Sequence, residues 1–161
     1  MKGKPVGRSR VEMTEIVLPA DTNQYGHVWG GHVMALIDKA AAIAAMRHAR
    51  RNVVTASVDS LVFRAPIKAA HILTLHAAVN AAFNTSLEVG VKVMSEDPHS
   101  GARAHCCSAY VTLVALDANG RPAPVPRLQT SSSEDRRRQR EARRRRRGRL
   151  ASRAARRPTG P

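Results

Sequence analysis

The segment of residues 29–49 constrains the fold of this chain more than any other. Two glycines open it, and residues 33–46 are apolar nearly all round, interrupted only by Asp38 and Lys39. Seven alanines lie between residues 35 and 49. A helix that is apolar on every side is usually buried, and small alanine side chains allow a sheet to approach closely. The segment therefore predicts one long, buried helix.

Strand-like runs lie on both sides of this helix. One run rich in β-branched residues precedes it, and four follow it, separated by turn-rich segments. The predicted strands cover residues 11–18, 53–63, 72–81, 85–94 and 104–116. This order of elements predicts an α+β fold in which a five-stranded antiparallel sheet wraps the helix.

The net charge of +15 is concentrated at the C-terminal end. Residues 1–126 hold 13 Lys and Arg and 9 Asp and Glu, whereas residues 127–161 hold 14 Arg and 3 acidic residues. We therefore expect a loose basic arm (1–10), one domain (11–124) and a disordered Arg-rich tail (125–161), since the tail has too little apolar surface to fold alone. The tail is either a plain solvated extension or a tether to nucleic acid or another anionic surface.

Composition excludes several classes of protein. No apolar run is long enough to span a membrane, and no apolar stretch follows the basic start as in a secretory signal. The two cysteines, Cys106 and Cys107, are adjacent and would point to opposite faces of a strand, so a disulfide framework is not expected. The histidines lack metal-binding spacing, and we expect no metal and no cofactor. The chain is therefore predicted to be cytoplasmic.

Three features of the chain suggest chemistry. Asp38 has almost purely apolar flanks, where a carboxylate is costly unless it is paired or useful. It could equally lie on an exposed stripe or form a structural ion pair. Gly30 and Gly31 would leave backbone N–H groups free at a helix start, where an anion or a developing oxyanion is stabilised. Asn23 lies in a turn-rich loop, and alone it indicates only a turn.

Taken together, these residues resemble those of a known family, the hotdog-fold acyl-CoA thioesterases. The resemblance covers residues 11–124 and is nearest to the branch of bacterial short acyl-CoA thioesterases and the cytosolic acyl-CoA hydrolase. The matching motifs are Asp21-Thr22-Asn23, Gly26, Trp29-Gly30-Gly31, Met34, Ile37-Asp38, residues 54–59, residues 63–67, residues 85–89 and residues 109–117.

The resemblance implies hydrolysis of a fatty acyl-CoA to a free fatty acid and coenzyme A, a reaction of lipid metabolism in which coenzyme A is part of the substrate. Asn23 of one subunit and Asp38 of the other would form the site across a homodimer, which would assemble as a trimer of dimers. The N–H groups of Gly30 and Gly31 would polarise the thioester, and Asp38 would act as general base or as nucleophile. The coenzyme A moiety would contact Arg64, Lys68, Thr85 and Ser86.

The sequence also departs from the family pattern. Trp29 replaces the histidine of a related branch, and residues 69–71 and 83–84 lack the usual Gly-Asp and Gly-Arg pairs near the coenzyme A. An alternative function is a non-catalytic acyl-CoA-binding hotdog tethered to nucleic acid by the Arg-rich tail. A third option is that the protein acts on a thioester of another carrier, such as acyl carrier protein. The preferred acyl chain length is not readable from the sequence.

Overall fold

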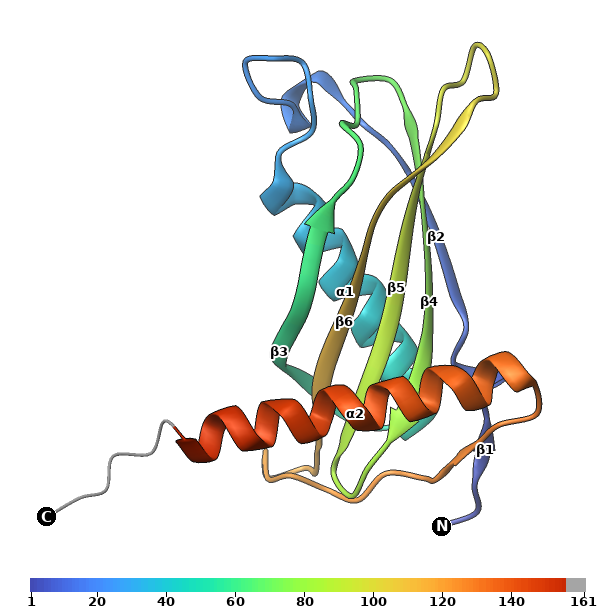
Figure 1. The fold of residues 1–161 in the computed structure, drawn as a ribbon, viewed down its shortest axis with the longest axis vertical. Coiled ribbons are helices and arrows are strands. Elements are labelled where there is room, and N and C mark those ends of the chain that lie inside the picture. Colours follow the sequence, from blue (N-terminus) through green and yellow to red (C-terminus); the bar gives the residue numbers. More distant parts are fainter. Residues whose placement is uncertain (156–161) are drawn as a thin grey trace, which may run out of the picture.

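The protein folds around one five-stranded antiparallel sheet, seen here in a computed structural model that describes residues 1–155 (Figure 1). The strand order is β2-β4-β5-β6-β3. The strands are β2 (Val11–Ile16), β3 (Asn52–Phe63), β4 (Ile72–Ala82), β5 (Ser86–Glu96) and β6 (Arg103–Leu116). The predicted α+β fold with five antiparallel strands is confirmed. The strand ends agree with the prediction to within about two residues, because alternating side chains mark them clearly.

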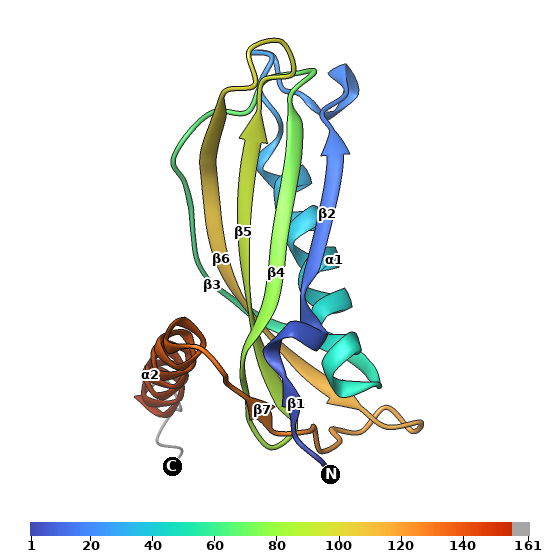
Figure 2. The ribbon, with the colours of Figure 1, turned by 90° about the vertical axis from the view of Figure 1, so that its right-hand side faces the viewer.

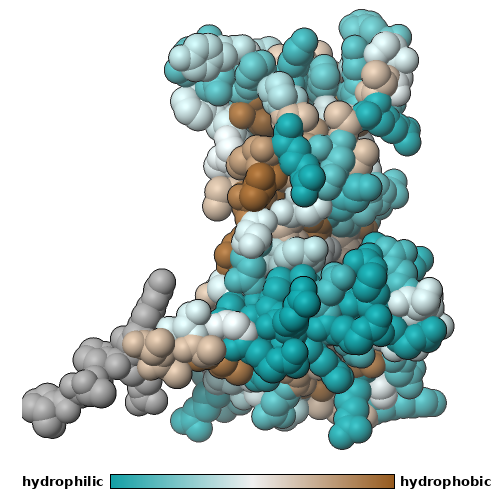
Figure 3. Space-filling view, viewed as in Figure 1, coloured by the Kyte–Doolittle hydropathy of each residue, from teal (hydrophilic) through white to brown (hydrophobic). Residues whose placement is uncertain are grey.

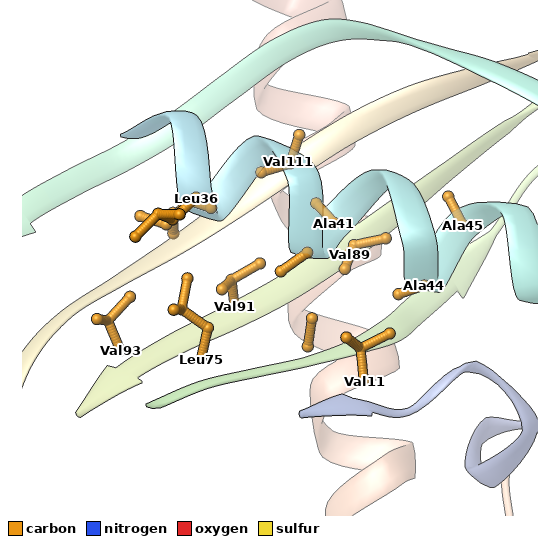
Figure 4. Close-up of a cluster of buried hydrophobic side chains, with 14 of the residues drawn as sticks. Val11, Leu36, Ala41, Ala44, Ala45, Leu75, Val89, Val91, Val93 and Val111 are labelled. Carbon is orange, nitrogen blue, oxygen red and sulfur yellow. The ribbon is translucent and has the colours of Figure 1, made fainter. Parts of the chain in front are cut away.

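The long helix α1 (Gly30–Ala49) lies against one face of this sheet (Figures 1 and 2). Alternate residues of the strands meet the alanine-rich face of the helix in a tightly packed core (Figure 4). The helix ends at Ala49, and the next residue, Arg50, caps it in a left-handed conformation in which its N–H donates to the carbonyl of Met46. The predicted long, buried helix is confirmed on the face that meets the sheet, whereas Met34, Asp38 and Met46 remain exposed in the single chain. One sheet covers only one side of a helix, whatever its sequence.

Strand β3 forms one edge of the sheet. Within residues 1–155 it pairs only with β6, so its other edge is unpaired. Two bulges interrupt the pairing, and four large apolar side chains of the strand are exposed: Val54, Val58, Val62 and Phe63. A long apolar edge strand is a surface that usually pairs with another strand.

The N-terminal residues are more ordered than the loose arm predicted for residues 1–10. Strand β1 (Lys4–Pro5) pairs in parallel with β7 (Leu128–Gln129), and the 3₁₀ helix η1 (Val6–Ser9) follows. Ser9 is fully buried, and its hydroxyl donates to the Val6 carbonyl and accepts the N–H of Val79. These bonds fix the segment to β4, a contact that composition does not reveal. A second 3₁₀ helix, η2 (Pro19–Asp21), follows β2.

The prediction of a disordered tail is wrong over most of its length. Residues Ser133–Ala155 form a second helix, α2, which crosses the outer face of the sheet, opposite α1 (Figures 1 and 2). The helix is stabilised by ion pairs with the sheet, described below, rather than by apolar burial. The last six residues of the predicted tail, 156–161, lie outside the described residues. Among residues 1–155, no helix has the length and apolar character needed to cross a membrane.

Candidate active site

Asp38 is joined to β3 by a short hydrogen bond. Its Oδ1 accepts the Thr55 hydroxyl at 2.5 Å, just before the first bulge of β3. The two side chains line a cavity of about 330 Å³ whose other walls are apolar: Met34, Ala35, Ile37, Val58 and Leu61. Asp38 is exposed in the single chain, so of the environments that the sequence left open, the structure shows the exposed one. The site is thus a fixed carboxylate at the mouth of an apolar hollow.

Thr55 is the residue that sequence reasoning missed as a partner of Asp38. In the sequence, Thr55 belongs to one of the matching motifs, residues 54–59, which implies no role for it. The hydroxyl bond leaves Oδ2 of Asp38 without a hydrogen bond among the described residues. A carboxylate with one oxygen anchored and the other free is oriented for proton transfer or attack.

The N-terminus of α1 presents unused backbone donors. Trp29 is the N-cap, and its side chain caps no N–H group. The N–H groups of Gly30 and Gly31 donate no hydrogen bond within residues 1–155, as expected for the first turn of a helix. A Cβ on Gly30 would lie 3.4 Å from the Phe63 ring, whereas one on Gly31 would meet open space. Such donors stabilise negative charge on an oxygen.

A second cavity opens beside this helix start. It has a volume of about 320 Å³ and is lined by His27, Val28, Gly30, Phe63, Arg64, Ala65, Pro66 and Ile67. The predicted residues Gly30 and Arg64 therefore share one hollow, which brings a backbone donor and a cation together. This combination suits an anionic or polarised ligand.

Asn23 has a structural role in its own loop. Its side-chain oxygen accepts the N–H groups of Tyr25 at 3.0 Å and His27 at 3.2 Å, while Gly26 provides the positive φ of +72° that the turn requires. The turn that an isolated Asn indicated is therefore present. Among the described residues, no hydrogen bond joins Asn23 to Asp38 within the chain. Any cooperation between the two must therefore come from different subunits or from a bound ligand.

The four residues predicted to contact coenzyme A divide between the two ends of the sheet. Arg64 and Lys68 follow β3 in the chain and lie at the same end of the sheet as the Asn23 loop. There the backbone of Lys68 forms an isolated antiparallel β-bridge with that of His27. Thr85 and Ser86 lie at the β4–β5 turn, at the opposite end. One chain alone does not bring these four residues together.

Two other groups of reactive side chains have different settings. Glu15, Asp21 and His32 come together beside the first turn of α1, with His32 Nε2 3.1 Å from Glu15 and Nδ1 3.5 Å from Asp21. The two nitrogens of the His32 ring therefore face two different carboxylates. The cysteines are buried, and burial raises the pKa of the Cys107 thiol to about 11, which disfavours a thiolate nucleophile.

Comparison with known proteins agrees with this geometry. A model of the thioesterase superfamily matches residues 25–102. An acyl-CoA thioester hydrolase of Bacillus subtilis is 43% identical over 120 residues, which are 74% of this chain and 70% of that protein.

Solved structures extend the likeness to α2. A hexameric acyl-CoA thioesterase shares 40% identity with a TM-score of 0.92, covering 98% of this chain and 100% of that one. The acyl-CoA hydrolase of Staphylococcus aureus, solved with butyryl coenzyme A, coenzyme A and coenzyme A disulfide, shares 37% identity with a TM-score of 0.88, covering 94% of this chain and 93% of that one. Alanine variants of the Staphylococcus aureus enzyme at an aspartate, an asparagine and a threonine have also been solved. The fold, the identity and the coverage agree, and the chain belongs to the thioesterase superfamily.

Proposed function

We propose that the protein hydrolyses the thioester of an acyl-CoA, releasing a free carboxylic acid and coenzyme A, with Asp38 as the reacting carboxylate. The observation that carries this proposal is the Thr55–Asp38 hydrogen bond at the mouth of an apolar cavity. An acyl chain needs apolar walls, and its hydrolysis needs a positioned carboxylate beside them. The reaction consumes acyl-CoA and water only.

The variants of the Staphylococcus aureus enzyme support this choice of residues. In that enzyme the altered asparagine lies 15 residues before the altered aspartate, and the altered threonine lies 17 residues after it. Asn23, Asp38 and Thr55 have the same spacings in this chain. We therefore assign Thr55 to the site together with the two residues predicted from the sequence.

Two chains are needed to complete the site. Gly30 and Asp38 lie on the same helix, eight residues and therefore about 12 Å apart along its axis. The N–H of Gly30 and the carboxylate of Asp38 in one chain are thus too far apart to act on the same carbonyl group. We propose that Asp38 of one subunit meets the helix start and the Asn23 loop of its partner.

The unpaired edge of β3 is the surface for this partner. It exposes Val54, Val58 and Val62, and Val58 also lines the cavity beside Asp38. Pairing along this edge would cover the apolar side chains and close the cavity against water. We propose a homodimer formed in this way, and its assembly as a trimer of dimers, in keeping with the hexameric thioesterase that the chain resembles.

The chemistry proceeds by one of two balanced routes. As general base, Asp38 removes a proton from water, the oxygen attacks the thioester carbon, and the carbon–sulfur bond breaks with protonation of the coenzyme A thiolate. As nucleophile, Asp38 itself attacks, coenzyme A leaves, and water then hydrolyses the anhydride. In either route the N–H groups of Gly30 and Gly31 stabilise the oxyanion. A single turnover in ¹⁸O-labelled water identifies the nucleophilic route if the label enters the Asp38 carboxyl group, because this requires attack of water on the Asp38 carbon of an anhydride. Label in the free acid alone is the result of the general-base route and also of water attack on the acyl carbon of an anhydride.

The decisive experiment compares three variants in an assay of coenzyme A release. We expect Asp38→Asn to lower turnover about 10²-fold to 10⁴-fold and Thr55→Val about 10-fold to 100-fold, as for a group that orients a reacting one. Lys39→Gln, next to Asp38 on the exposed side of α1, is the matched control and should keep full activity. A folded Asp38→Asn protein with normal turnover would contradict the mechanism. Tight binding of acyl-CoA without hydrolysis by the wild type would indicate the binding module instead.

The contacts with coenzyme A and the location remain part of this proposal. We propose that Arg64 and Lys68 of one subunit and Thr85 and Ser86 of another approach the same coenzyme A, since one chain holds them at opposite ends of the sheet.

We propose a cytoplasmic location because Cys106 and Cys107 are free thiols, which a reducing compartment maintains.

A further inference from the structure

Helix α2 has two faces with different uses of arginine. At 3.6 residues per turn, Asp135, Ala142, Arg145 and Arg149 lie on one side of the helix. These are the residues that turn toward the sheet, and Asp135 and Ala142 are buried there. The opposite side carries a second group of arginines, separated from the first by half a turn of the helix.

The arginines of the docked face have carboxylate partners in the sheet. Arg145 binds both oxygens of Glu88, at 2.6 Å for Nη2–Oε1 and 3.3 Å for Nε–Oε2, and its guanidinium lies 3.5 Å from the centre of the Tyr110 ring. Burial disfavours the charge on Arg145, but the hydrogen bonds and charge of Glu88 outweigh it and hold the pKa above its usual value. Arg149 pairs with Asp59 on β3 and lies 3.7 Å from Glu88. These two arginines therefore attach the helix to the sheet.

The arginines of the open face have no such partners. We define the arginine stripe as Arg140, Arg143, Arg144 and Arg147, which fall within about 100° of arc on the helix. All four are exposed. Across residues 1–155, no carboxylate lies within 4.0 Å of any of them, and none is named in the ion pairs of the helix.

The acidic residues of α2 are already engaged elsewhere. Glu134 pairs with Arg137 and Arg138, and Glu141 pairs with Arg137. Asp135 accepts hydrogen bonds at the start of the helix. The arginine stripe therefore remains an uncompensated line of charge, in which neighbours three and four residues apart repel one another. An external polyanion would relieve this repulsion.

The shape and chemistry of the stripe select the kind of polyanion. Guanidinium groups match the geometry of phosphate oxygens and can bind them in pairs. Helix α2 stands out from the sheet as a ridge (Figure 2), and its surface in Figure 3 is hydrophilic except near its C-terminal end. A groove about 12 Å wide, such as the major groove of B-DNA, admits a helix. Leu150 is the only large apolar side chain exposed on the described helix, which disfavours insertion into a membrane interface.

We propose that the arginine stripe binds the phosphodiester backbone of duplex nucleic acid, without reading its sequence. The helix carries no aromatic side chain on which bases of a single strand could stack. This binding surface is separate from the proposed hydrolase site. Helix α2 lies on the face of the sheet opposite to α1, which carries Asp38. If the stripe makes four phosphate contacts, raising the salt concentration from 50 to 200 mM should weaken binding roughly 150-fold.

The test uses the full chain and a labelled 30-base-pair duplex of arbitrary sequence, followed by fluorescence anisotropy. The stripe variant carries Arg140→Gln, Arg143→Gln, Arg144→Gln and Arg147→Gln. Glutamine is a good helix former, so α2 should persist, and circular dichroism and acyl-CoA turnover report on the fold. The control variant removes the same charge from exposed positions elsewhere: Arg8→Gln, Arg51→Gln, Arg121→Gln and Arg127→Gln.

We expect the stripe variant to bind the duplex at least 30-fold more weakly than the wild type at 50 mM salt, with a smaller dependence on salt, and turnover unchanged. The control variant should lose less than 5-fold. Equal binding by the wild type and the stripe variant would overturn the proposal, as would an equal loss in the control. If the wild type binds phosphatidylserine vesicles but not the duplex, the proposal is wrong, and the partner of the stripe is a membrane surface. Because turnover is measured separately, failure of this proposal is distinguishable from failure of the hydrolase assignment.

Discussion

The two helices of this protein pack on the two faces of the same sheet by different forces. Helix α1 meets the inner face through side chains such as Leu36, Ala40 and Ala44, all apolar and buried. Helix α2 meets the outer face chiefly through Arg145 and Arg149, with Ala142 the one fully buried apolar residue of the contact. Apolar contact is non-directional and tolerates salt, whereas an ion pair requires its exact partner. The contact of α1 with the inner face should therefore tolerate single changes, whereas the contact of α2 with the outer face should be broken by the loss of one ion pair.

The largest expected effect is on the inner face. Leu113 of β6 is fully buried in the core beneath α1. Leu113→Ala removes apolar contacts and leaves a cavity, so we expect a loss of about 2–5 kcal/mol in the free energy of unfolding in urea. Val114→Ala, at the next and partly exposed position of β6, is the control and should cost less. Similar losses for the two variants would contradict the assignment of the core to the inner face.

A smaller effect is expected at the outer face, and it should be local. Arg145→Gln removes the main partner of the fully buried Glu88 and should cost about 1.5–3 kcal/mol. Because α2 has little apolar contact, the helix should loosen while the sheet stays folded. Amide hydrogen exchange should therefore accelerate over residues 133–155 and remain slow in β4 to β6. The neighbouring exposed Arg144→Gln is the control, and unchanged exchange of α2 in Arg145→Gln would refute ionic docking.

A pH-dependent effect is expected where the inner face meets the segment leading to α2. His48 of α1 is buried, and its Nε2 donates to the carbonyl of Pro126 at 2.9 Å. Burial lowers the pKa of His48, an effect that the charge of Lys4 reinforces and the Pro126 bond opposes. The unfolded chain then binds a proton more readily, so this stability is present above about pH 6.5 and is lost as the pH falls toward the folded pKa.

The corresponding measurement is the melting temperature between pH 8 and pH 5. We expect a decline on acidification that is reduced in His48→Gln, whose amide can still donate to Pro126. His99→Gln, at an exposed turn position, is the matched control and should follow the wild type. A decline in His48→Gln as steep as in the wild type would show that other groups cause it.

The smallest effect is expected for an ion pair within α2 itself. Arg137 and Glu141 form an exposed pair at 2.8 Å, four residues apart on the helix. Arg137→Gln should lower the stability of α2 by only about 0.2–0.5 kcal/mol. Hydrogen exchange of α2 in this variant should be nearly that of the wild type, well below the change in Arg145→Gln. An effect as large as that of Arg145→Gln would remove the distinction between ion pairs within the helix and those with the sheet.

The same comparison explains which parts of the structure could be predicted from the sequence. The inner face left clear periodic patterns, so the helix at residues 30–49 and all five strands were predicted within about two residues. Helix α2 left none, because its stability depends on Glu88 and Asp59, which are distant in sequence. Thr55 was missed as a site residue for the same reason, since its role depends on facing Asp38 across the fold. The sequence does not decide whether Asp38 is exposed, because its burial depends on the number of chains present.

The surface on which α2 docks also has a consequence for the order of folding. Arg149 contacts Asp59 on β3 and Glu88 on β5, and β6 lies between these two strands. The two carboxylates are therefore brought into place only after β6 has joined the sheet, although they are already present in the chain. During synthesis, α2 is made after α1 and all five strands of the sheet, so it can dock on a completed surface. We expect the sheet and α1 to form first, and α2 to close onto them as the final step.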